Sequence, residues 1–274
     1  MNMRTLDFRH TPVRLAAAAT LTLGLSAGAQ AAQVQVKVNV ENLAPTNSVT
    51  VAPLRVGFHS GVFDAFNIGE AAGAAIQLIA ESGSDALWNP AFSAADPTAV
   101  VGSVLPGPLF PGATASSTFM VDTAQNPYFS YAAMVVPSND FFIGNDNPTA
   151  YQLFDGAGHL QISSITLKSK DIWDAGTEIY DPLTAAFVTV GNAAGHADQN
   201  SVVAHNFAEF YAFNGLNTAA GYVFDAQLGA DTDVYRISFE VTPVPEPETY
   251  AMMLAGLGLL GLVARRRARV QRIG

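Results

Sequence analysis

The chain has 274 residues, no cysteine, and 23 acidic residues against 13 basic ones. The lack of cysteine excludes disulfides, thiolate zinc sites and cysteine nucleophiles. Eight of the basic residues lie in two short terminal segments, so residues 32–243 carry 5 basic and 20 acidic residues, a net charge of −15. Such a surface repels nucleic acid and anionic lipid and attracts metal cations, which excludes nucleic-acid binding.

Residues 1–31 have the features of a secretory signal peptide. Three arginines precede an apolar stretch at 15–25, and Ala29-Gln30-Ala31 follows it. A basic region, an apolar region and an Ala-x-Ala site in this order are typical of such a peptide. We expect cleavage after Ala31, with Ala32 as the alternative, and export of the remaining chain.

Segments of alternating apolar and polar residues follow. Residues 34–41 and 235–241 alternate without a break, which indicates strands with one buried face. We expect Val36, Val38 and Val40 to be buried, as well as Ile237, Phe239 and Val241, and we expect Lys37 and Arg236 to be exposed. Further strands are predicted at 48–58, 117–121, 129–136, 160–167 and 186–190. Clusters of Gly, Pro, Asn and Asp separate them, which is typical of an all-β, antiparallel β-sandwich.

One segment departs from this pattern. Residues 70–81 are rich in alanine and lack proline, and Ala72, Ile76 and Ile79 fall on one helical face. Gly83 stands just beyond them, where a glycine commonly ends a helix. We predict here the one substantial helix of the body, followed by a long ordered loop at 85–111. No repeat or linker divides residues 32–243, so we expect a single sandwich domain.

The last part of the chain carries three features in a fixed order. Val244-Pro245-Glu246-Pro247 comes first, then an apolar run at 249–264, then Arg265-Arg266-Arg267. Together they resemble a PEP-CTERM sorting signal, which bacterial exosortases recognise. We therefore expect residues 244–274 to form such a signal, with Pro245, Glu246 and Pro247 as its motif and the apolar run as a short transmembrane helix.

The length and charge of this tail agree with a temporary anchor. Its 16 apolar residues would form a helix of about 24 Å, which is shorter than the roughly 30 Å core of a bilayer. The arginines should stay cytoplasmic, so the body should face outward. An ordinary tail anchor would explain the apolar run but not the Pro-Glu-Pro motif. We expect processing by an exosortase-type enzyme, only transient contact with the inner membrane, and a final location in the cell envelope, cell surface or extracellular matrix of a Gram-negative bacterium.

Three segments of the body resemble the spondin N-terminal domain. They are Phe58-His59-Ser60 with the predicted helix and Ala80-Glu81-Ser82-Gly83, then Pro137-Ser138-Asn139-Asp140, then Asp174-Ala175-Gly176-Thr177-Glu178. Their order matches the His-Ser pair, the Pro-Ser-x-Asp block and the Asp-Ala-Gly-Thr block of that family. Asn139 and Phe141 depart from a second proline and a tryptophan of the family. The cysteine-rich repeats of animal relatives are missing, so animal adhesion roles do not carry over.

The resemblance implies a β-sandwich with a divalent-cation site, for which we expect calcium. The aspartates of the two blocks correspond to Asp140 and Asp174, and Asp122 is the nearest candidate for a third acid. Calcium takes about six to eight oxygen ligands, and further oxygen donors lie nearby in the sequence at Asn145, Asp146, Asp171, Glu178 and Asp181. Asp and Asn also favour turns for local backbone reasons, so solvated loop acids are the alternative.

The remaining candidates give no pattern of an enzyme. His59 is expected to be a buried, hydrogen-bonded histidine, and Glu81 to pack or cap near the end of the helix. The other histidines are widely spaced, without the HExxH pattern of a zinc protease. We therefore expect a non-enzymatic protein of the extracellular matrix, adhesion or biofilm, with exopolysaccharide or another matrix component as partner. The alternatives are an extracellular polysaccharide hydrolase that uses loop carboxylates, and ligand carriage within the sandwich.

Overall fold

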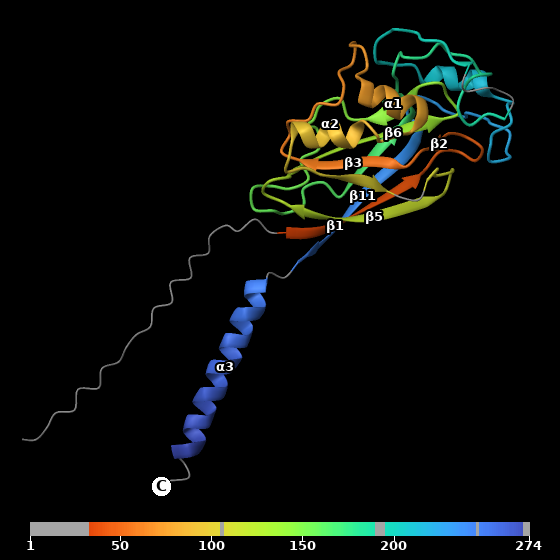
Figure 1. The fold of residues 1–274 in the computed structure, drawn as a ribbon. Coiled ribbons are helices and arrows are strands. Elements are labelled where there is room, and N and C mark those ends of the chain that lie inside the picture. Colours follow the sequence, from red (N-terminus) through yellow and green to blue (C-terminus); the bar gives the residue numbers. More distant parts are fainter. Residues whose placement is uncertain (1–32, 105–106, 190–194, 245–246, 271–274) are drawn as a thin grey trace, which may run out of the picture. The chain divides into compact units, whose positions relative to one another are not determined.

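The computed structural model describes residues 33–104, 107–189, 195–244 and 247–270. The predicted signal peptide lies outside these residues, and so do Pro245 and Glu246 of the sorting motif. Within the described residues, two antiparallel sheets form the body, and helices cover one face of the larger sheet (Figure 1). The fold is the predicted β-sandwich.

The smaller sheet contains the two segments that alternate most regularly. Its strands lie in the order β5 (Thr114–Asp122), β1 (Gln33–Asn42), β11 (Asp233–Pro243) and β8 (Ser164–Lys168). In this register Val38 lies opposite Phe239, and both side chains are buried, as predicted. Lys37 and Arg236 lie on the other face and are about half exposed. Val241 is only partly buried, because it lies near the end of β11.

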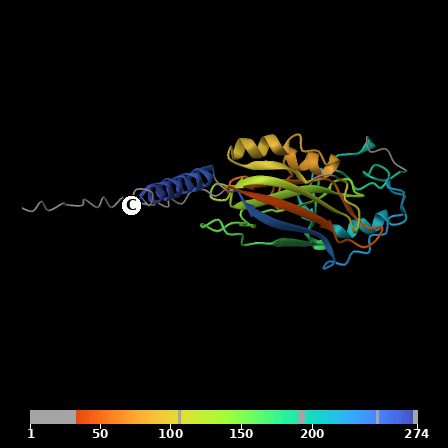
Figure 2. The same cartoon turned by 90° about the horizontal axis from the view of Figure 1, so that it is seen from below.

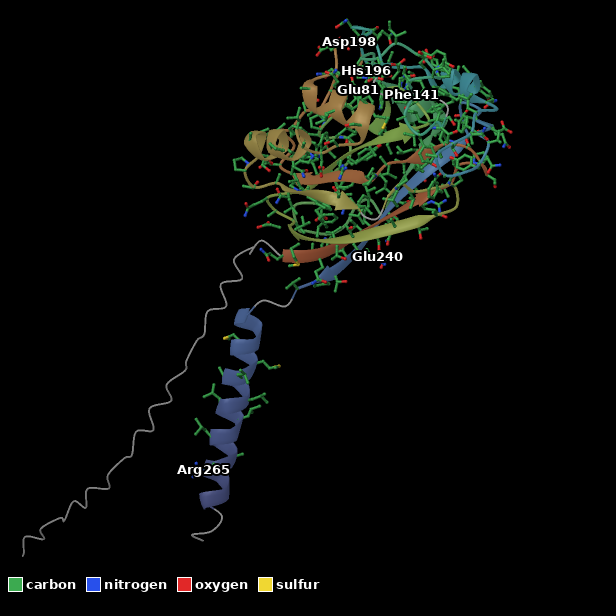
Figure 3. All side chains as sticks on the ribbon, turned by 45° about the vertical axis from the view of Figure 1, so that its right-hand side comes forward. Glu81, Phe141, His196, Asp198, Glu240 and Arg265 are labelled. Atoms are coloured by element: carbon green, nitrogen blue, oxygen red, sulfur yellow. The ribbon has the colours of Figure 1, made fainter. Side chains whose placement is uncertain are left out.

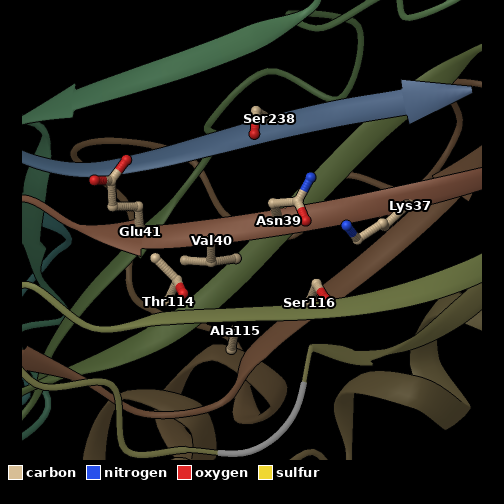
Figure 4. A pocket seen from close by; sticks show the side chains of 8 residues that line it. All are labelled: Lys37, Asn39, Val40, Glu41, Thr114, Ala115, Ser116 and Ser238. Atoms are coloured by element: carbon tan, nitrogen blue, oxygen red, sulfur yellow. The ribbon is translucent and has the colours of Figure 1, made fainter.

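The outward face of this sheet is polar, and its charges pair with one another. Lys37 Nζ lies 3.5 Å from Glu240 Oε1, and Arg236 Nη1 lies 2.8 Å from Glu41 Oε2. Between these ion pairs is a shallow hollow of about 530 Å³, whose other lining residues are mostly short and polar (Figure 4): Asn39, Thr114, Ser116 and Ser238. Since the charges already have partners, this face is a solvated sheet surface.

The larger sheet holds the remaining strands. Its order is β10 (Ala204–His205), β9 (Ile172–Asp174), β7 (Phe141–Gly144), β6 (Tyr128–Val136), β3 (Leu54–His59) and β4 (Val100–Val104), with β2 (Thr50–Val51) paired to β6. The predicted strand at 48–58 is divided into β2 and β3 at Pro53. A proline has no N–H to donate to a ladder, so it interrupts strand pairing.

Aromatic side chains join the layers. The ring of Phe129 on β6 meets the ring of Phe239 on β11 edge to face, with centroids 4.9 Å apart, and closes the core between the sheets. On the opposite face of the larger sheet, α1 (Ala74–Ser82) and α2 (Trp88–Ala95) bury a second apolar cluster (Figures 1 and 2). Phe92 of α2 lies directly over Gly57, where a Cβ would stand 2.4 Å from the ring. A glycine is therefore needed in β3 for α2 to approach the sheet.

Several element predictions are wrong in detail. The helix predicted at 70–81 begins only at Ala74, because Gly73 is extended, and it ends as predicted at Gly83 in the left-handed conformation. It is not the one substantial helix, since α2 and β4 occupy the predicted loop at 85–111. Trp88 and Phe92, four residues apart and fully buried, are the helical signal in that stretch. The predicted strand at 160–167 is ordered as a strand only from Ser164 onward.

The segment at 186–190 does not form the predicted strand within its described part, 186–189. It makes only isolated bridges, from Ala186 to Ser138 and from Val188 to Thr218. Two short 3₁₀ helices were also not predicted, η1 (Ser169–Asp171) and η3 (Phe207–Phe213). Aromatic residues of η3 pack against the sheet: the ring of Phe210 lies edge to face on Phe141, with centroids 4.7 Å apart. Nonlocal packing therefore decides the conformation here.

The tail forms helix α3 (Pro247–Val270). None of the helices that the structure describes is long and apolar enough to cross a membrane. This finding does not support the transmembrane helix that the sequence predicts in the tail. The apolar run has only 16 residues, and α3 continues from it directly into arginines.

Candidate metal site

Asp140 and Asp174 lie side by side on neighbouring strands of the larger sheet. Asp140 immediately precedes β7 and Asp174 ends β9, and the pairing of Phe141 with Asp174 sets the two acids next to each other. The Ala175 N–H donates to the Asp140 carbonyl at 3.2 Å. Both residues are buried, with 3% of Asp140 and 8% of Asp174 exposed. Strand pairing thus joins two motifs that are 34 residues apart in the sequence.

The Pro-Ser block forms the turn from β6 into β7. The hydroxyl of Ser138 donates to the Val135 carbonyl at 2.5 Å and accepts the N–H of Phe141 at 3.1 Å. The Asn139 side chain ties the turn to a distant loop, because its Oδ1 accepts the Asp181 N–H at 3.1 Å. These bonds hold the backbone on both sides of Asp140 and so fix where its carboxylate lies.

The Asp-Ala-Gly-Thr block folds its backbone donors around Asp140. Oδ1 of Asp174 accepts the N–H of Gly176 at 2.8 Å, a local turn that bends the chain back. Oδ2 of Asp140 then accepts three hydrogen bonds, from the Thr177 N–H at 2.7 Å, the Thr177 hydroxyl at 3.1 Å and the Glu178 N–H at 3.0 Å. A single carboxylate oxygen therefore organises the whole 174–178 loop.

Gly176 is needed at this turn for two reasons, and its replacement should be costly. Its φ is +68°, and a Cβ would lie 2.7 Å from the Val202 carbonyl oxygen. Backbone strain and the clash together should make Gly176→Ala lower the free energy of unfolding by about 3 kcal/mol. Urea denaturation would measure the loss.

Gly215→Ala is the matched control. Its φ of +86° is also positive, but nothing lies within 4 Å of the position that a Cβ would take there. The control should lose only about 1 kcal/mol, the conformational cost alone. Equal losses in the two variants would mean that the close approach of Val202 is unimportant.

The site is acidic and has no basic partner from Lys or Arg. The pKa of Asp140 is raised to about 6, first by burial and also by the charge of Asp174, against the hydrogen bonds from the 177–178 loop that lower it. Burial also raises the pKa of Asp174. The five basic residues of the body pair with other acids: Lys37 with Glu240, Arg55 with Asp85, Lys168 with Asp233, Lys170 with Asp231, and Arg236 with Glu41. A cation for this site would have to come from solution.

Glu209 and Asn206 join this cluster from η3 and the residue before it. Asn206 Nδ2 donates to Asp174 Oδ2 at 3.4 Å and also to the Glu209 carboxylate. Burial raises the pKa of Glu209, and the charges of Asp174 and Asp140 raise it further. Neither residue is among the candidates from the sequence. No local pattern relates them to Asp174, because they reach it only through the docking of η3 on β9.

A carboxylate and a histidine lie at the rim of the site. Glu178 Oε1 is 3.4 Å from His196 Nδ1. Burial raises the pKa of Glu178 to about 7, opposed by His196 and reinforced by the charges of Glu81 and Asp140. Figure 3 shows Glu81 and His196 at the same end of the body as Phe141, the residue after Asp140. Glu81 itself accepts a hydrogen bond from Gln77 within α1 at 2.8 Å, which agrees with a packing role.

Asp122 is not brought to this pair, which corrects the expectation of a third acidic ligand. Asp122 precedes the start of β6, whereas Asp140 follows its end. A strand of nine residues spans roughly 30 Å, so the two acids lie near opposite ends of β6. Asp122 instead closes a local turn, where its Oδ1 accepts the N–H groups of Ala124 at 3.0 Å and Gln125 at 3.1 Å.

The other possible oxygen ligands considered from the sequence accept hydrogen bonds elsewhere. Asn145 Oδ1 accepts the Tyr131 N–H, Asp146 accepts the Ile68 N–H, Asp171 accepts the Lys168 N–H, and Asp181 accepts the Leu183 N–H. Among the described residues, no group of three or more His, Asp or Glu side chains is arranged to hold a metal ion. A cation at Asp140 and Asp174 would therefore take its remaining ligands from backbone, amide or water oxygens.

His59 is the buried, hydrogen-bonded histidine that the sequence predicts. Gly61 donates its N–H to Nδ1 at 3.0 Å, so Nε2 carries the proton and donates to the Ser130 hydroxyl at 2.9 Å. Burial lowers the pKa of His59 to about 4, although the charge of Asp96 opposes this shift. The residue is neutral and structural at physiological pH.

This histidine should make the protein sensitive to acid. Its pKa is about 4 in the folded state and about 6.5 in the unfolded state, so between these values the unfolded state binds more protons. The contribution of His59 to the free energy of unfolding should fall by about 3 kcal/mol as pH falls from 6.5 to 4. His59→Leu removes this titration. The difference in the free energy of unfolding between wild type and the variant should therefore become smaller as pH falls from 6.5 to 4. Parallel stability curves for wild type and His59→Leu would contradict the prediction.

Two family models match the chain. The model of the PEP-CTERM protein-sorting motif matches residues 243–267, and the Spondin_N model matches residues 44–213. The second match covers more than half of the chain, so the protein belongs to the Spondin_N family, which is not a known enzyme family. The two matches together describe an exported protein of the cell envelope or the exterior that is sorted by an exosortase. No curated protein matches the chain.

Proposed function

We propose that this protein is a non-enzymatic module that binds a divalent cation, calcium, between Asp140 and Asp174. The observation that supports it best is the pair of buried carboxylates at the ends of two paired strands, 3% and 8% exposed, for which the body offers no free Lys or Arg. Two such charges repel each other, and a bound cation would remove that cost. The sorting motif and the family indicate where the protein works, and the two carboxylates support the proposal of a bound cation.

The donor set fits calcium. Oδ2 of Asp140 is occupied by three hydrogen bonds, whereas its Oδ1 accepts none from the residues that the structure describes. Asp174 Oδ2 receives only the long 3.4 Å contact from Asn206. One oxygen of each carboxylate can therefore serve a cation, and calcium accepts carbonyl, amide and water oxygens for the rest. Bound there, calcium would supply positive charge at the junction of β7, β9 and the 174–178 loop.

We further propose that the mature form begins at about residue 32, loses the tail near Pro245–Pro247, and acts in the matrix, adhesion or biofilm of a Gram-negative bacterium. Exopolysaccharide or another matrix component would be its partner, and contact with the inner membrane would last only until processing. The acidic surface supports this role, because divalent cations can bridge it to other acidic polymers.

A polysaccharide hydrolase is the second candidate, and one observation favours it. Glu178 is protonated at neutral pH more readily than an ordinary glutamate and lies near the carboxylate of Asp140, so one acid and one base stand close together, as in glycosidases. Release of reducing sugar from neutral and anionic polysaccharides, with wild type, Glu178→Gln and Asp140→Ala, would separate the two functions. We expect no release by any of the three proteins. Release by wild type that is lost in both variants would establish the hydrolase.

A further inference from the structure

A second cavity lies at the edge of the larger sheet, where β10 meets η1 and η3. It has a volume of about 470 Å³ and is lined by Lys170, Asp171, His205, Asn206, Phe207 and Ala208. Small-molecule sites commonly have volumes of roughly 300–1,000 Å³ and combine apolar or aromatic walls with a few polar groups. This cavity has that size and that composition.

One wall of the cavity is an aromatic platform that is held in place from behind. The imidazole of His205 stacks on the indole of Trp173, with centroids 3.9 Å apart and planes inclined by 23°. The indole is itself fixed, because its Nε1 donates to the Gly144 carbonyl at 3.0 Å and its ring packs on Phe66. His205 and Phe207 line the cavity, whereas Trp173 supports His205 from outside its lining.

The polar groups of the cavity retain both donors and acceptors. Asp171 uses Oδ2 for the Lys168 N–H, and Asn206 uses its amide N–H groups for Asp174 and Glu209, so one oxygen on each side chain has no hydrogen bond from the described residues. The Lys170 ammonium donates one hydrogen bond, to Asp231 at 2.7 Å, and has two further N–H groups. A hydroxyl group can donate a hydrogen bond to a carboxylate or amide oxygen and accept one from an ammonium. A ligand with several hydroxyl groups therefore matches the donors and acceptors of this cavity.

The local charge disfavours an anion. The ammonium of Lys170 is already paired with Asp231, and Asp171 adds a negative charge to the wall. Asp174 and Glu209 lie behind Asn206 and add to the negative potential. A phosphate or carboxylate would be repelled, whereas a neutral ligand would not.

We propose that this cavity binds a neutral sugar ring of a hydroxyl-rich polysaccharide. The apolar face of the ring lies on His205 and Phe207, and its hydroxyls bond to Asp171, Asn206 and Lys170. None of these five residues is a proposed calcium ligand, so the sugar site is distinct from the metal site. Asn206 borders both, because its amide also contacts Asp174.

The tryptophans provide a direct test. The chain has two, and Trp88 is fully buried, so a change in fluorescence on adding sugar reports on Trp173 under the platform. The full-length protein would be titrated with gluco-, manno- and galacto-tetraose and, for comparison, with tetragalacturonate. At least one neutral tetraose should give a saturable change, with affinity confirmed by calorimetry. His205→Ala and Lys170→Ala should each weaken that affinity, by about tenfold for His205→Ala.

His159→Ala, at an exposed histidine outside the cavity, should bind as wild type does, and melting curves would show that each variant is folded. The double variant Asp140→Asn with Asp174→Asn should still bind sugar even where it no longer binds calcium. The calcium proposal and the sugar proposal can therefore fail independently of each other. The sugar site would be overturned if no neutral tetraose binds, if tetragalacturonate binds more tightly than all of them, or if folded His205→Ala and Lys170→Ala bind as wild type does.

Discussion

Calcium should raise the melting temperature of the full-length protein by about 5–10 °C when its concentration is a hundred times the dissociation constant. Binding to the folded state alone contributes about 2.7 kcal/mol at that ratio, and each kcal/mol shifts the melting temperature of a domain of this size by about 2–4 °C. Asp140→Asn with Asp174→Asn should abolish the rise, because both proposed carboxylate ligands lose their charge. Thermal melts with calcium and with chelator would measure it.

Asp122→Asn is the matched control, because this acid lies at the far end of β6 and should keep the full calcium response. Without calcium, the double variant should be at least as stable as wild type at pH 8, since it no longer confines two charges in a buried site. A double variant that still responds to calcium like wild type would place the ion elsewhere. A loss of response in Asp122→Asn would refute the arrangement described for that residue.

The calcium response should also depend on pH. The pKa of Asp140 is raised to about 6 in the folded state from its ordinary value of 3.8, so the folded state without calcium binds more protons than the unfolded state between these values. Stability without calcium should therefore lose this contribution as pH rises through 6. Calcium needs the ionised carboxylates, so the rise in melting temperature should be larger at pH 8 than at pH 5. A response of equal size at both values would argue against Asp140 as a ligand.

Replacing Pro245, Glu246 and Pro247 by alanine should prevent removal of the tail in a host that contains an exosortase. The sorting model matches residues 243–267, which include all three positions. Wild type should yield a product that ends near residues 245–247, whereas the triple variant should keep the apolar run and the arginines. Mass spectrometry of the carboxyl-terminal peptide would decide between these forms.

The triple variant should leave the fold unchanged. The last strand, β11, ends at Pro243, and Val244 makes the last backbone contact before the motif, to Gln33 at 3.2 Å. Thr242→Ala, on an exposed position of β11, should be processed as wild type and serves as the control. An intact Gly274 terminus in wild type from such a host would reduce the tail to a plain anchor.

Local patterns in the sequence correctly predicted the sandwich and the two central strands of its smaller sheet. Strict alternation in 34–41 and 235–241 specifies which side chains are buried, because successive side chains on a strand point to opposite faces of the sheet. A shift of the strand register by one residue would bury Lys37. The order of the blocks around Asp140 and Asp174 was likewise sufficient to identify the family. The turn at Asp174 and Gly176 is also local, since its hydrogen bond joins residues two apart.

The composition of the site depended on contacts between distant segments. Asp140 and Asp174 meet because β7 pairs with β9, and Glu209 and Asn206 arrive because η3 docks beside them. Asp122 is excluded because β6 separates it from the pair by its whole length.

The sequence by itself therefore determined the sorting signal and the alternating strands, and it singled out Asp140 and Asp174 as candidates. Each of these depends on residues that are close together in the chain. The tertiary structure alone decided which acids share a buried environment, that Trp88 and Phe92 form a second helix, and that His205 rests on Trp173. The pKa values also depend on the tertiary structure, because burial raises the pKa of Asp140 and lowers the pKa of His59. Burial is a property of packed neighbours, and the neighbours of these residues come from other parts of the chain.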